Sequence, residues 1–440
     1  MTSQKTENQF QLLTQKRFGW FFTAQFLGAF NDNLFKMALI ILISFELSTK
    51  NPDLANMLAS LCTGAFVLPF FLFSAFAGQI ADKFDKATLI RWIKCLEILI
   101  TSLAAIAFHK LALNWLVVLL MLMGSHSALF GPVKYSYLPK QLHPSELIGG
   151  NGLVEMGTFL AILIGTLLGG VLIGIERYGT YVVAATTITV AVMGWGAATQ
   201  IPSTPSESKH IRINFNFISE IYYNLKLAAQ NPSILLYLFA ISWFWFLGAS
   251  FLTQIGNYTA HYVHGTPAIV SLLIGAFSIG IGLGALSCEK LSNKKIEKGL
   301  VPFGAIGMAF FILDYSLVHL TFPSDHSLVT TQMFFQYGAY WHLLFSQIGL
   351  GLFGGIYIVP LYAMIQHHSP PEICSRIIAA NNLLNALFMV FSSIIAIGMF
   401  SWSFTIYQLF FVILVLHIAV LSIIFWIDRD LLKRFKAWLL

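Results

Sequence analysis

Long apolar runs alternate with short polar stretches along this chain. A helix that crosses a bilayer needs roughly 20 mostly apolar residues, so the pattern predicts twelve membrane-spanning helices. We expect these helices near residues 20–45, 56–80, 88–108, 113–133, 150–174, 179–200, 233–258, 267–287, 300–321, 338–366, 377–400 and 404–427. The longest polar stretch runs from Pro202 to Phe217, and an amphipathic piece follows it to about Asn231. The pattern therefore predicts an all-α membrane protein with a six-helix bundle at 1–200, a cytoplasmic loop at 201–232, and a six-helix bundle with a short basic tail at 233–440.

Short sequence matches relate the two predicted bundles to each other. They recur in the same order, about 220 to 230 residues apart, which indicates an internal duplication. The matches are Phe26–Ala29 with Phe246–Ala249, His143–Leu147 with Ser369–Ile373, and the polar pair Asn151 and Glu155 with Asn381 and Asn385. Parallel repeats of this kind place a substrate site at their interface, near the membrane midplane. We therefore expect two pseudo-repeats around a shared passage.

Composition and charge agree with a membrane location. Hydrophobic residues make up 57% of the chain and charged residues 10%, whereas a soluble domain has about 45–50% and about 25%. With the N-terminus inside, most Lys and Arg residues fall in cytoplasmic segments, as the positive-inside rule requires. Both termini, including the polar tail of about the first seventeen residues, are therefore expected in the cytoplasm. This topology accounts for the formal charge of +6, so no nucleic-acid partner is expected.

The sequence favours no catalytic or cofactor chemistry. The four cysteines are scattered singly, without Cys or His at metal-ligand spacing, and the histidines form no His-Glu-x-x-His pair. A phosphate-binding loop of the Gly-x-x-x-x-Gly-Lys type is also missing from the sequence. We therefore predict neither an enzyme nor a metal or other cofactor.

Asp32 lies roughly half a membrane deep in the first predicted span. A lone charge at that depth costs about 2.5–3.5 kcal/mol or more, so it faces a cavity or a partner. Two interpretations are open. Asp32 pairs with Lys36, one turn further along the same helix face, or it forms, with Asn31 and Asn33, a site that contacts or gates a ligand headgroup.

Glu155 and Lys134 are the other ionisable candidates. For Glu155 we weigh a hydrogen bond between helices, or a charge pair with Lys134, against a role in transport. Lys134 lies where the fourth predicted span meets the cytoplasmic interface. It either extends to lipid phosphates or recognises an anionic headgroup. Together with the residues around Asp32, the predicted substrate or gating set is Asn31, Asp32, Asn33, Lys36, Lys134, Asn151, Glu155, Asn381 and Asn385.

The loop between the second and third predicted spans carries a different motif, with Gly78, Asp82, Lys83 and Lys86. Gly78 permits close approach of a neighbouring helix. Asp82 can accept backbone N–H groups at a helix N-terminus, where the helix dipole favours an anion. We predict a cytoplasmic gate here and no substrate site.

These residues resemble a known family. The segment Gly78–Lys86 is similar to the loop motif of the major facilitator superfamily, with Asp85 where a glycine is common. The segments Phe26–Lys36, Phe130–Tyr135 and Glu146–Phe159 are similar to the lysophospholipid transporter branch of that superfamily. The resemblance implies a major facilitator fold, with Asp32 at the acidic position of the first-helix motif and Lys134 at the basic position after Gly-Pro-Val.

The resemblance also implies a function. Proteins of that branch move lysophospholipids, such as lysophosphatidylethanolamine, from the outer to the inner leaflet of the cytoplasmic membrane. We expect a monomer that does so by alternating access among the membrane lipids; because the sequence ends at Leu440, an acyltransferase partner would be a separate protein. The alternative is a proton-coupled exporter or importer of a small amphiphilic metabolite, siderophore or drug, with Asp32 as the coupling carboxylate.

Overall fold

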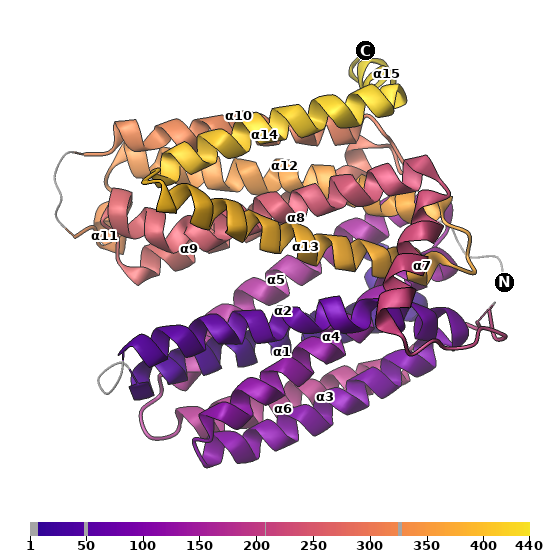
Figure 1. Cartoon of the computed structure of the whole chain (residues 1–440), viewed down its shortest axis with the longest axis horizontal. Helices are drawn as coiled ribbons and strands as arrows, with labels where there is room; N and C mark the ends of the chain where they lie inside the picture. The colour runs from indigo at the N-terminus through magenta and orange to yellow at the C-terminus, as the bar shows by residue number, and fades with distance from the viewer. Residues whose placement is uncertain (1–7, 48–51, 207, 324–327) are drawn as a thin grey trace. The chain divides into compact units, whose positions relative to one another are not determined.

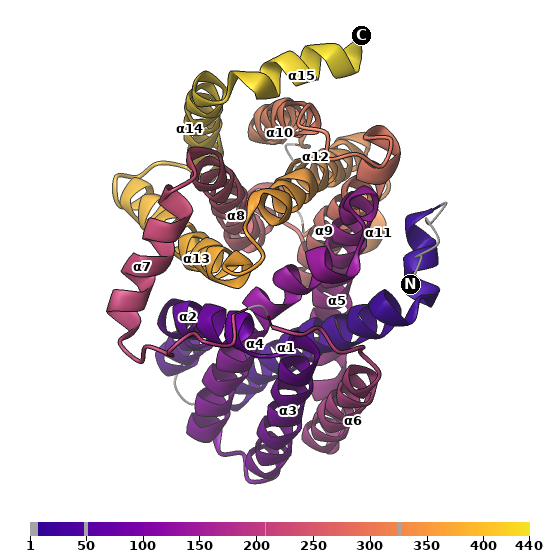
Figure 2. The ribbon, with the colours of Figure 1, turned by 90° about the vertical axis from the view of Figure 1, so that its right-hand side faces the viewer.

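A computed structural model describes residues 8–47, 52–206, 208–323 and 328–440 (Figures 1 and 2). Residues 1–7, which begin the predicted N-terminal tail, lie outside this part of the chain. The α-helices are α1 (Lys16–Leu47), α2 (Pro52–Lys83), α3 (Lys86–His109), α4 (Leu113–Gln141), α5 (Leu147–Ile173), α6 (Gly179–Thr199), α7 (Phe217–Ala229), α8 (Pro232–Tyr258), α9 (Pro267–Leu291), α10 (Leu300–Leu317), α11 (Thr331–Phe334), α12 (Gly338–His368), α13 (Cys374–Ser401), α14 (Ile406–Ile427) and α15 (Arg429–Leu439).

The predicted all-helical membrane architecture is confirmed. Within the described residues, eleven helices are long and apolar enough to cross a membrane. The helix α3 is the remaining one of the twelve predicted spans. It has 24 residues, packs against α4 and α6, and carries Lys86, Arg91, Lys94 and Glu97 in its first half.

The chain forms two compact units that do not follow the linear order completely. The first unit contains residues 1–143, 160–232 and 366–383, and the second contains residues 144–159, 233–365 and 384–440. Each unit therefore takes part of α5 and part of α13. The predicted division into two linear halves with a connecting loop stays a prediction.

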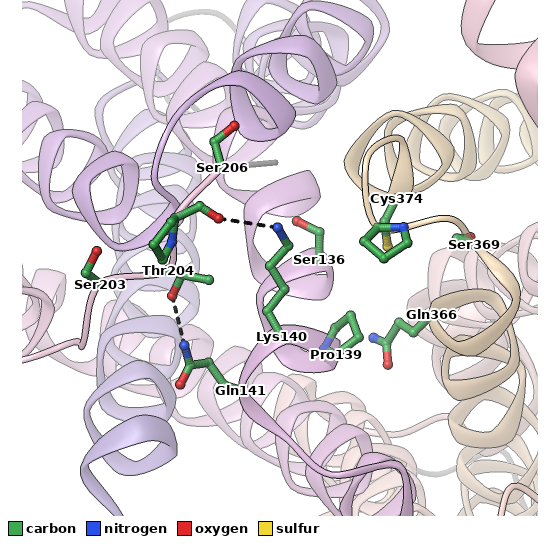
Figure 3. A pocket seen from close by; sticks show the side chains of 12 residues that line it. Ser136, Pro139, Lys140, Gln141, Ser203, Thr204, Ser206, Gln366, Ser369 and Cys374 are labelled. Atoms are coloured by element: carbon green, nitrogen blue, oxygen red, sulfur yellow. Dashed lines mark hydrogen bonds between the residues drawn. The ribbon is translucent and has the colours of Figure 1, made fainter. Parts of the chain in front are cut away.

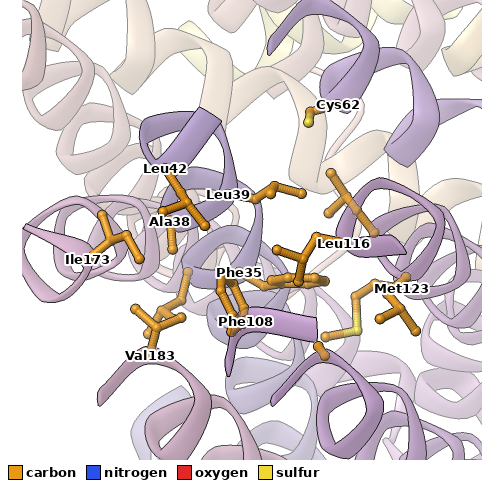
Figure 4. Packing of buried hydrophobic residues seen from close by; sticks show 14 of the residues in the cluster. Phe35, Ala38, Leu39, Leu42, Cys62, Phe108, Leu116, Met123, Ile173 and Val183 are labelled. Carbon is orange, nitrogen blue, oxygen red and sulfur yellow. The ribbon is translucent and has the colours of Figure 1, made fainter. Parts of the chain in front are cut away.

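The core of the first unit is an apolar cluster between α1, α3 and α4 (Figure 4). Phe35 of α1 and Phe108 of α3 meet edge to face, with ring centroids 5.6 Å apart. Leu39 and Leu116 are fully buried beside them. In the same unit α2 packs along α4, and α3 packs along α6. This frame fixes the helix faces that carry the polar residues described below.

The second unit contains a pair of helices in unusually close contact. A Cβ atom added to any of four glycines would collide with a backbone carbonyl of the opposite helix. These glycines are Gly280 and Gly284 of α9 and Gly351 and Gly355 of α12. Small residues at four-residue spacing allow this approach because no side chain separates the two backbones.

The short helix α15 docks on the same unit. Its Trp438 side chain donates a hydrogen bond to the carbonyl of Leu291 at 2.8 Å, and the Trp438 ring packs on Phe303 with centroids 5.2 Å apart. Leu431 is 1% exposed. The remaining surface of α15 is largely basic, so the helix is amphipathic.

Candidate functional site

A buried cluster of ionisable side chains lies inside the first unit. We call it the Glu97 cluster and define it as Asn31, Asp32, Lys94, Glu97 and His126. The Glu97 carboxylate accepts a hydrogen bond from Lys94 Nζ at 2.7 Å and from Asn31 Nδ2 at 2.7 Å. The Nε2 atom of His126 lies 3.3 Å from the same carboxylate. Polar or charged side chains from helices α1, α3 and α4 therefore meet around the Glu97 carboxylate.

The cluster is sealed from solvent and lipid. Lys94 is 1% exposed and Glu97 is fully buried. The Lys94 ammonium also lies over the Phe130 ring, 5.5 Å from its centroid, which is within the reach of about 6 Å for a cation–π contact. Burying two charges in a low-dielectric interior is tolerable only when they are paired and hydrogen-bonded. The Glu97 carboxylate meets this requirement.

Gly28 makes room for the Lys94 side chain. A Cβ atom at Gly28 would collide with Lys94 Nζ, whereas a Cβ at the repeat-related Gly248 would meet no atom within 4 Å. The Phe-Leu-Gly-Ala repeat therefore has a specific packing role in its first copy alone. The two copies of the Phe-Leu-Gly-Ala repeat differ because the first copy lies beside the Glu97 cluster.

Asp32 lies at the edge of the cluster. Its carboxylate accepts a short hydrogen bond from Ser127 and interacts electrostatically with His126, Glu97 and Lys94. Its Oδ1 atom is buried without a hydrogen-bond partner. A buried oxygen without a partner is costly unless a ligand, a water or a proton satisfies it.

The structure does not show the direct ion pair between Asp32 and Lys36 that was one of the two interpretations. Lys36 Nζ donates to Asn33 Oδ1 at 3.0 Å and lies over the Phe66 ring, 5.2 Å from its centroid. Asn33 in turn donates to the carbonyl of Ala29. Among the ion pairs of the described residues within 4.0 Å, none joins Asp32 to Lys36, and the two charges interact only at longer range.

Lys134 and Asn381 also belong to the first unit. Lys134 is 8% exposed, and its ammonium lies 4.9 Å from the centroid of the Tyr135 ring. The side chain is therefore buried, and its role, as a contact to lipid phosphates or in recognition of an anionic headgroup, stays a prediction. Asn381 is fully buried.

Three predicted residues belong to the second unit. Asn151 is fully buried and donates to the carbonyl of Leu147, one turn earlier in α5. Glu155 is 1% exposed. Asn385 accepts a hydrogen bond from Ser242 at 2.9 Å. The structure thus places Asn31 and Asp32 in the Glu97 cluster and joins Asn33 to Lys36, while the other predicted residues are divided between the two units.

The gate motif contacts the beginning of α13, which is part of the first unit. Asp82 Oδ1 accepts a hydrogen bond from the backbone N–H of Ser375 at 3.0 Å. A Cβ atom at Gly78 would lie 2.8 Å from the Cβ of Ala379. The Ser375 hydroxyl donates to Ser136 of α4 at 2.9 Å. The acid and the glycine therefore make the contacts expected at a helix N-terminus, while their gating role stays a prediction.

The two lysines of the motif have different surroundings. Lys86 is 1% exposed and donates to the carbonyl of Ala81 at 2.9 Å, in the last turn of α2. A cation there interacts favourably with the negative end of the helix dipole. Lys83 is partly exposed, and its ammonium lies 5.7 Å from the centroid of the Phe84 ring.

Asp85 has a structural role that the sequence did not reveal. It is the N-cap of α3, where it accepts the N–H of Thr88 at 2.7 Å, and it also accepts from the Ser203 hydroxyl and the Thr204 N–H. Partial burial raises the pKa of Asp85, but these hydrogen bonds outweigh burial and leave the pKa below its ordinary value. The carboxylate thus ties the start of α3 to the segment after α6.

Sequence reasoning missed Lys94 and Glu97. Both side chains are buried in α3. The signal was available: opposite charges three residues apart, inside a predicted span, form a pair on one helix face. His126 of α4 lies beside Glu97 of α3, and no local sequence pattern indicates this contact.

Comparison with known proteins agrees with this architecture. The family model described as Major Facilitator Superfamily matches residues 21–338. The chain is 26% identical over 367 residues to the lysophospholipid transporter LplT of Enterobacter sp. (strain 638), covering 82% of this chain and 83% of the relative. It is 26% identical over 390 residues to LplT of Pectobacterium carotovorum, covering 87% of this chain and 86% of the relative.

Solved structures share the fold. The human organic anion transporter MFSD10 superposes with a TM-score of 0.71 at 12% identity, covering 93% of this chain and 99% of that one. The Escherichia coli fucose:proton symporter FucP superposes with a TM-score of 0.68 at 13% identity, covering 94% and 98%. The chain is thus a multi-pass membrane transporter, and it belongs to the Major Facilitator Superfamily.

Proposed function

We propose that this transporter moves lysophospholipid, of the lysophosphatidylethanolamine kind, from the outer to the inner leaflet of the cytoplasmic membrane. The observation that carries the proposal is the likeness to proteins named lysophospholipid transporter over more than four fifths of the chain. Both termini lie in the cytoplasm, as the distribution of Lys and Arg predicts.

The Glu97 cluster supports this substrate class by its chemistry. A lysophosphatidylethanolamine headgroup carries an ammonium and a phosphate, so a binding path needs both acids and bases. Asp32 has a buried carboxylate oxygen without a partner, which suits the ammonium. The neighbouring Glu97 is already neutralised by Lys94, so Asp32 is the carboxylate of the cluster that is available to a ligand.

Transport by alternating access requires an end of the molecule that closes and opens. The contact of Asp82 with the N-terminus of α13 supports such a gate, because a single carboxylate–amide interaction of this kind contributes about 1.5–3 kcal/mol. A contact of that size can be broken and remade during a transport cycle. In this proposal the headgroup passes along the polar residues while the acyl chain stays in an apolar environment.

A leaflet-transfer assay tests the proposal. Purified protein is reconstituted into vesicles, and transfer of fluorescent lysophosphatidylethanolamine is followed by protection from an extravesicular quencher. We expect transfer by the native chain and at least a tenfold slower rate for Asp32→Asn. The matched control is Asp314→Asn, since Asp314 is a helix carboxylate of the second unit, with Ser346 and His342 as its partners.

Two outcomes would contradict the proposal. Transfer of lysolipid at the rate of protein-free vesicles would remove the substrate assignment. Equal rates for Asp32→Asn and Asp314→Asn, with active native protein, would remove Asp32 from the path. Repeating the assay with a proton gradient and a soluble amphiphile separates lysolipid transfer from proton-coupled transport of a small metabolite.

A further inference from the structure

A second polar site lies in the first unit, away from the Glu97 cluster. It is a cavity of about 430 Å³ between the end of α4, the segment 203–206 and the connection from α12 to α13 (Figure 3). The cavity therefore has space for a small polar molecule or a lipid headgroup.

The lining of this cavity is selective in charge. Among the described residues that line it, Lys140 is the one charged side chain, and its ammonium lies 3.5 Å from the carbonyl oxygen of Pro205. The Ser136 hydroxyl donates to the carbonyl of Pro132, and the Gln141 amide donates to Thr204. The lysine supplies a compact positive charge with three donor hydrogens, which suits an oxyanion.

Two acids near the cavity already have hydrogen-bond partners. Asp85 accepts from Ser203 and from the N–H of Thr204, and Asp82 accepts the N–H of Ser375. Neither residue is among those that line the cavity.

One buried group in the wall has no partner. Ser369 is 7% exposed, and its Oγ atom makes no hydrogen bond. It lines the cavity together with Cys374, the first residue of α13, so the positive end of a 28-residue helix adjoins the same space. The Asp82 carboxylate already accepts an N–H group at this helix end, so the features that favour an anionic ligand are the lysine and the unpartnered hydroxyl.

We propose that this cavity binds a phosphate group, with Lys140 and Ser369 as its principal ligands. The phosphate belongs either to the headgroup of a glycerophospholipid or to a free phosphate ion. Because the cavity adjoins the Asp82–Ser375 contact, a bound phosphate stabilises the closed arrangement of α13 on α4. The lipid form of the proposal rests on the proposed function, and the phosphate site itself does not.

Thermal unfolding of the purified full-length protein in detergent tests the site. The probes are sn-glycero-3-phosphoethanolamine, inorganic phosphate and, as a control, ethanolamine alone. We expect a saturable rise of the unfolding midpoint with the two phosphate compounds and none with ethanolamine. Lys140→Gln should weaken phosphate affinity about tenfold, the loss of one charge-assisted hydrogen bond. Lys209→Gln, at an exposed lysine nearby, should leave the affinity unchanged.

The two sources give different results. Tighter binding of glycerophosphoethanolamine than of phosphate identifies the lipid headgroup, and equal or weaker binding identifies free phosphate. A rise without saturation, or an equal loss in Lys140→Gln and Lys209→Gln, would overturn the site. Neither result depends on the leaflet-transfer assay, so failure here is distinct from failure of the proposed function.

A second measurement keeps the test decisive if Lys140→Gln does not fold. A cysteine placed at the exposed, cavity-lining Pro205, in a Cys95→Ser background, should be alkylated by a soluble maleimide. Phosphate should slow this alkylation several-fold, and Ser369→Ala should reduce that protection. Alkylation at the same rate with and without phosphate would contradict the proposal.

Discussion

Replacing Glu97 with leucine should destabilise the protein more than replacing its partner Lys94 with methionine. The two changes are unequal because the partners of the two charges differ. The Glu97 carboxylate is shared by Lys94, Asn31 and His126. Among the described residues, the Lys94 ammonium contacts Glu97 and the Phe130 ring, and it interacts at longer range with Asp32. Loss of Glu97 therefore leaves a buried cation without its hydrogen-bonded counter-ion.

The magnitude follows from the burial of the pair. Removing one partner of a buried ion pair costs about 3–5 kcal/mol, because the other charge stays in a low-dielectric site. We expect the upper end of this range for Glu97→Leu. For Lys94→Met we expect about 3 kcal/mol or less, since the carboxylate keeps Asn31 and His126. The double variant removes both charges, so its loss should be smaller than that of Glu97→Leu alone.

The assay is a double-mutant cycle on unfolding midpoints, measured in one detergent at one pH. The control is the exposed pair of Lys298 and Asp430, whose atoms are 3.2 Å apart with side chains 24% and 50% exposed. Surface pairs contribute about 0–1 kcal/mol, so Asp430→Asn should shift the midpoint little. Equal losses for the two single variants, or a double variant as unstable as their sum, would refute the reasoning.

Three further predictions rest on separate contacts. Gly28→Ala should lower both the unfolding midpoint and lysolipid transfer because it displaces Lys94, whereas Gly248→Ala should change neither; equal effects would exclude this explanation. Asp85→Ala should cost about 1 kcal/mol at neutral pH through the lost helix cap. Hydrogen bonds outweigh burial and keep the pKa of Asp85 low. The contribution of Asp85 to the stability of the folded protein is therefore present above about pH 4 and disappears as the pH falls through the lowered pKa. The unfolding midpoints of the native protein and the variant should converge in acid. Trp438→Ala should speed hydrogen exchange in α15 but not in the spans, since this ring anchors the helix; unchanged exchange would show that α15 is held by other contacts.

The membrane spans were predictable because an α-helix that crosses a bilayer needs roughly 20 consecutive, mostly apolar residues. The boundaries of α6, expected at 179–200 and found at Gly179–Thr199, show how closely this constraint acts. The contact of Asp82 with a helix N-terminus was also predictable, since a short acidic side chain after a small-residue helix face has few other partners. In these cases local chemistry determines the outcome.

The Glu97 cluster was harder to predict because its members come from helices far apart in sequence. Asn31 and Glu97 are 66 residues apart, and no local pattern brings them together. Lys36 shows the opposite problem: its spacing from Asp32 suggested an ion pair, but a long side chain can reach several partners from one helix position, and it contacts Asn33 and Phe66. Packing between helices, which spacing does not encode, decides both cases.

The glycine contacts between α9 and α12 restrict how the second unit can deform. With carbonyl oxygens seated directly against the opposite backbone at four positions, a shift of one helix along the other by a fraction of a turn would drive main-chain atoms into each other. Side chains can rotate aside, but main chain cannot. Helices α9 and α12 are therefore fixed in one register and move as a rigid unit. Any bending during a transport cycle has to occur in the neighbouring helices.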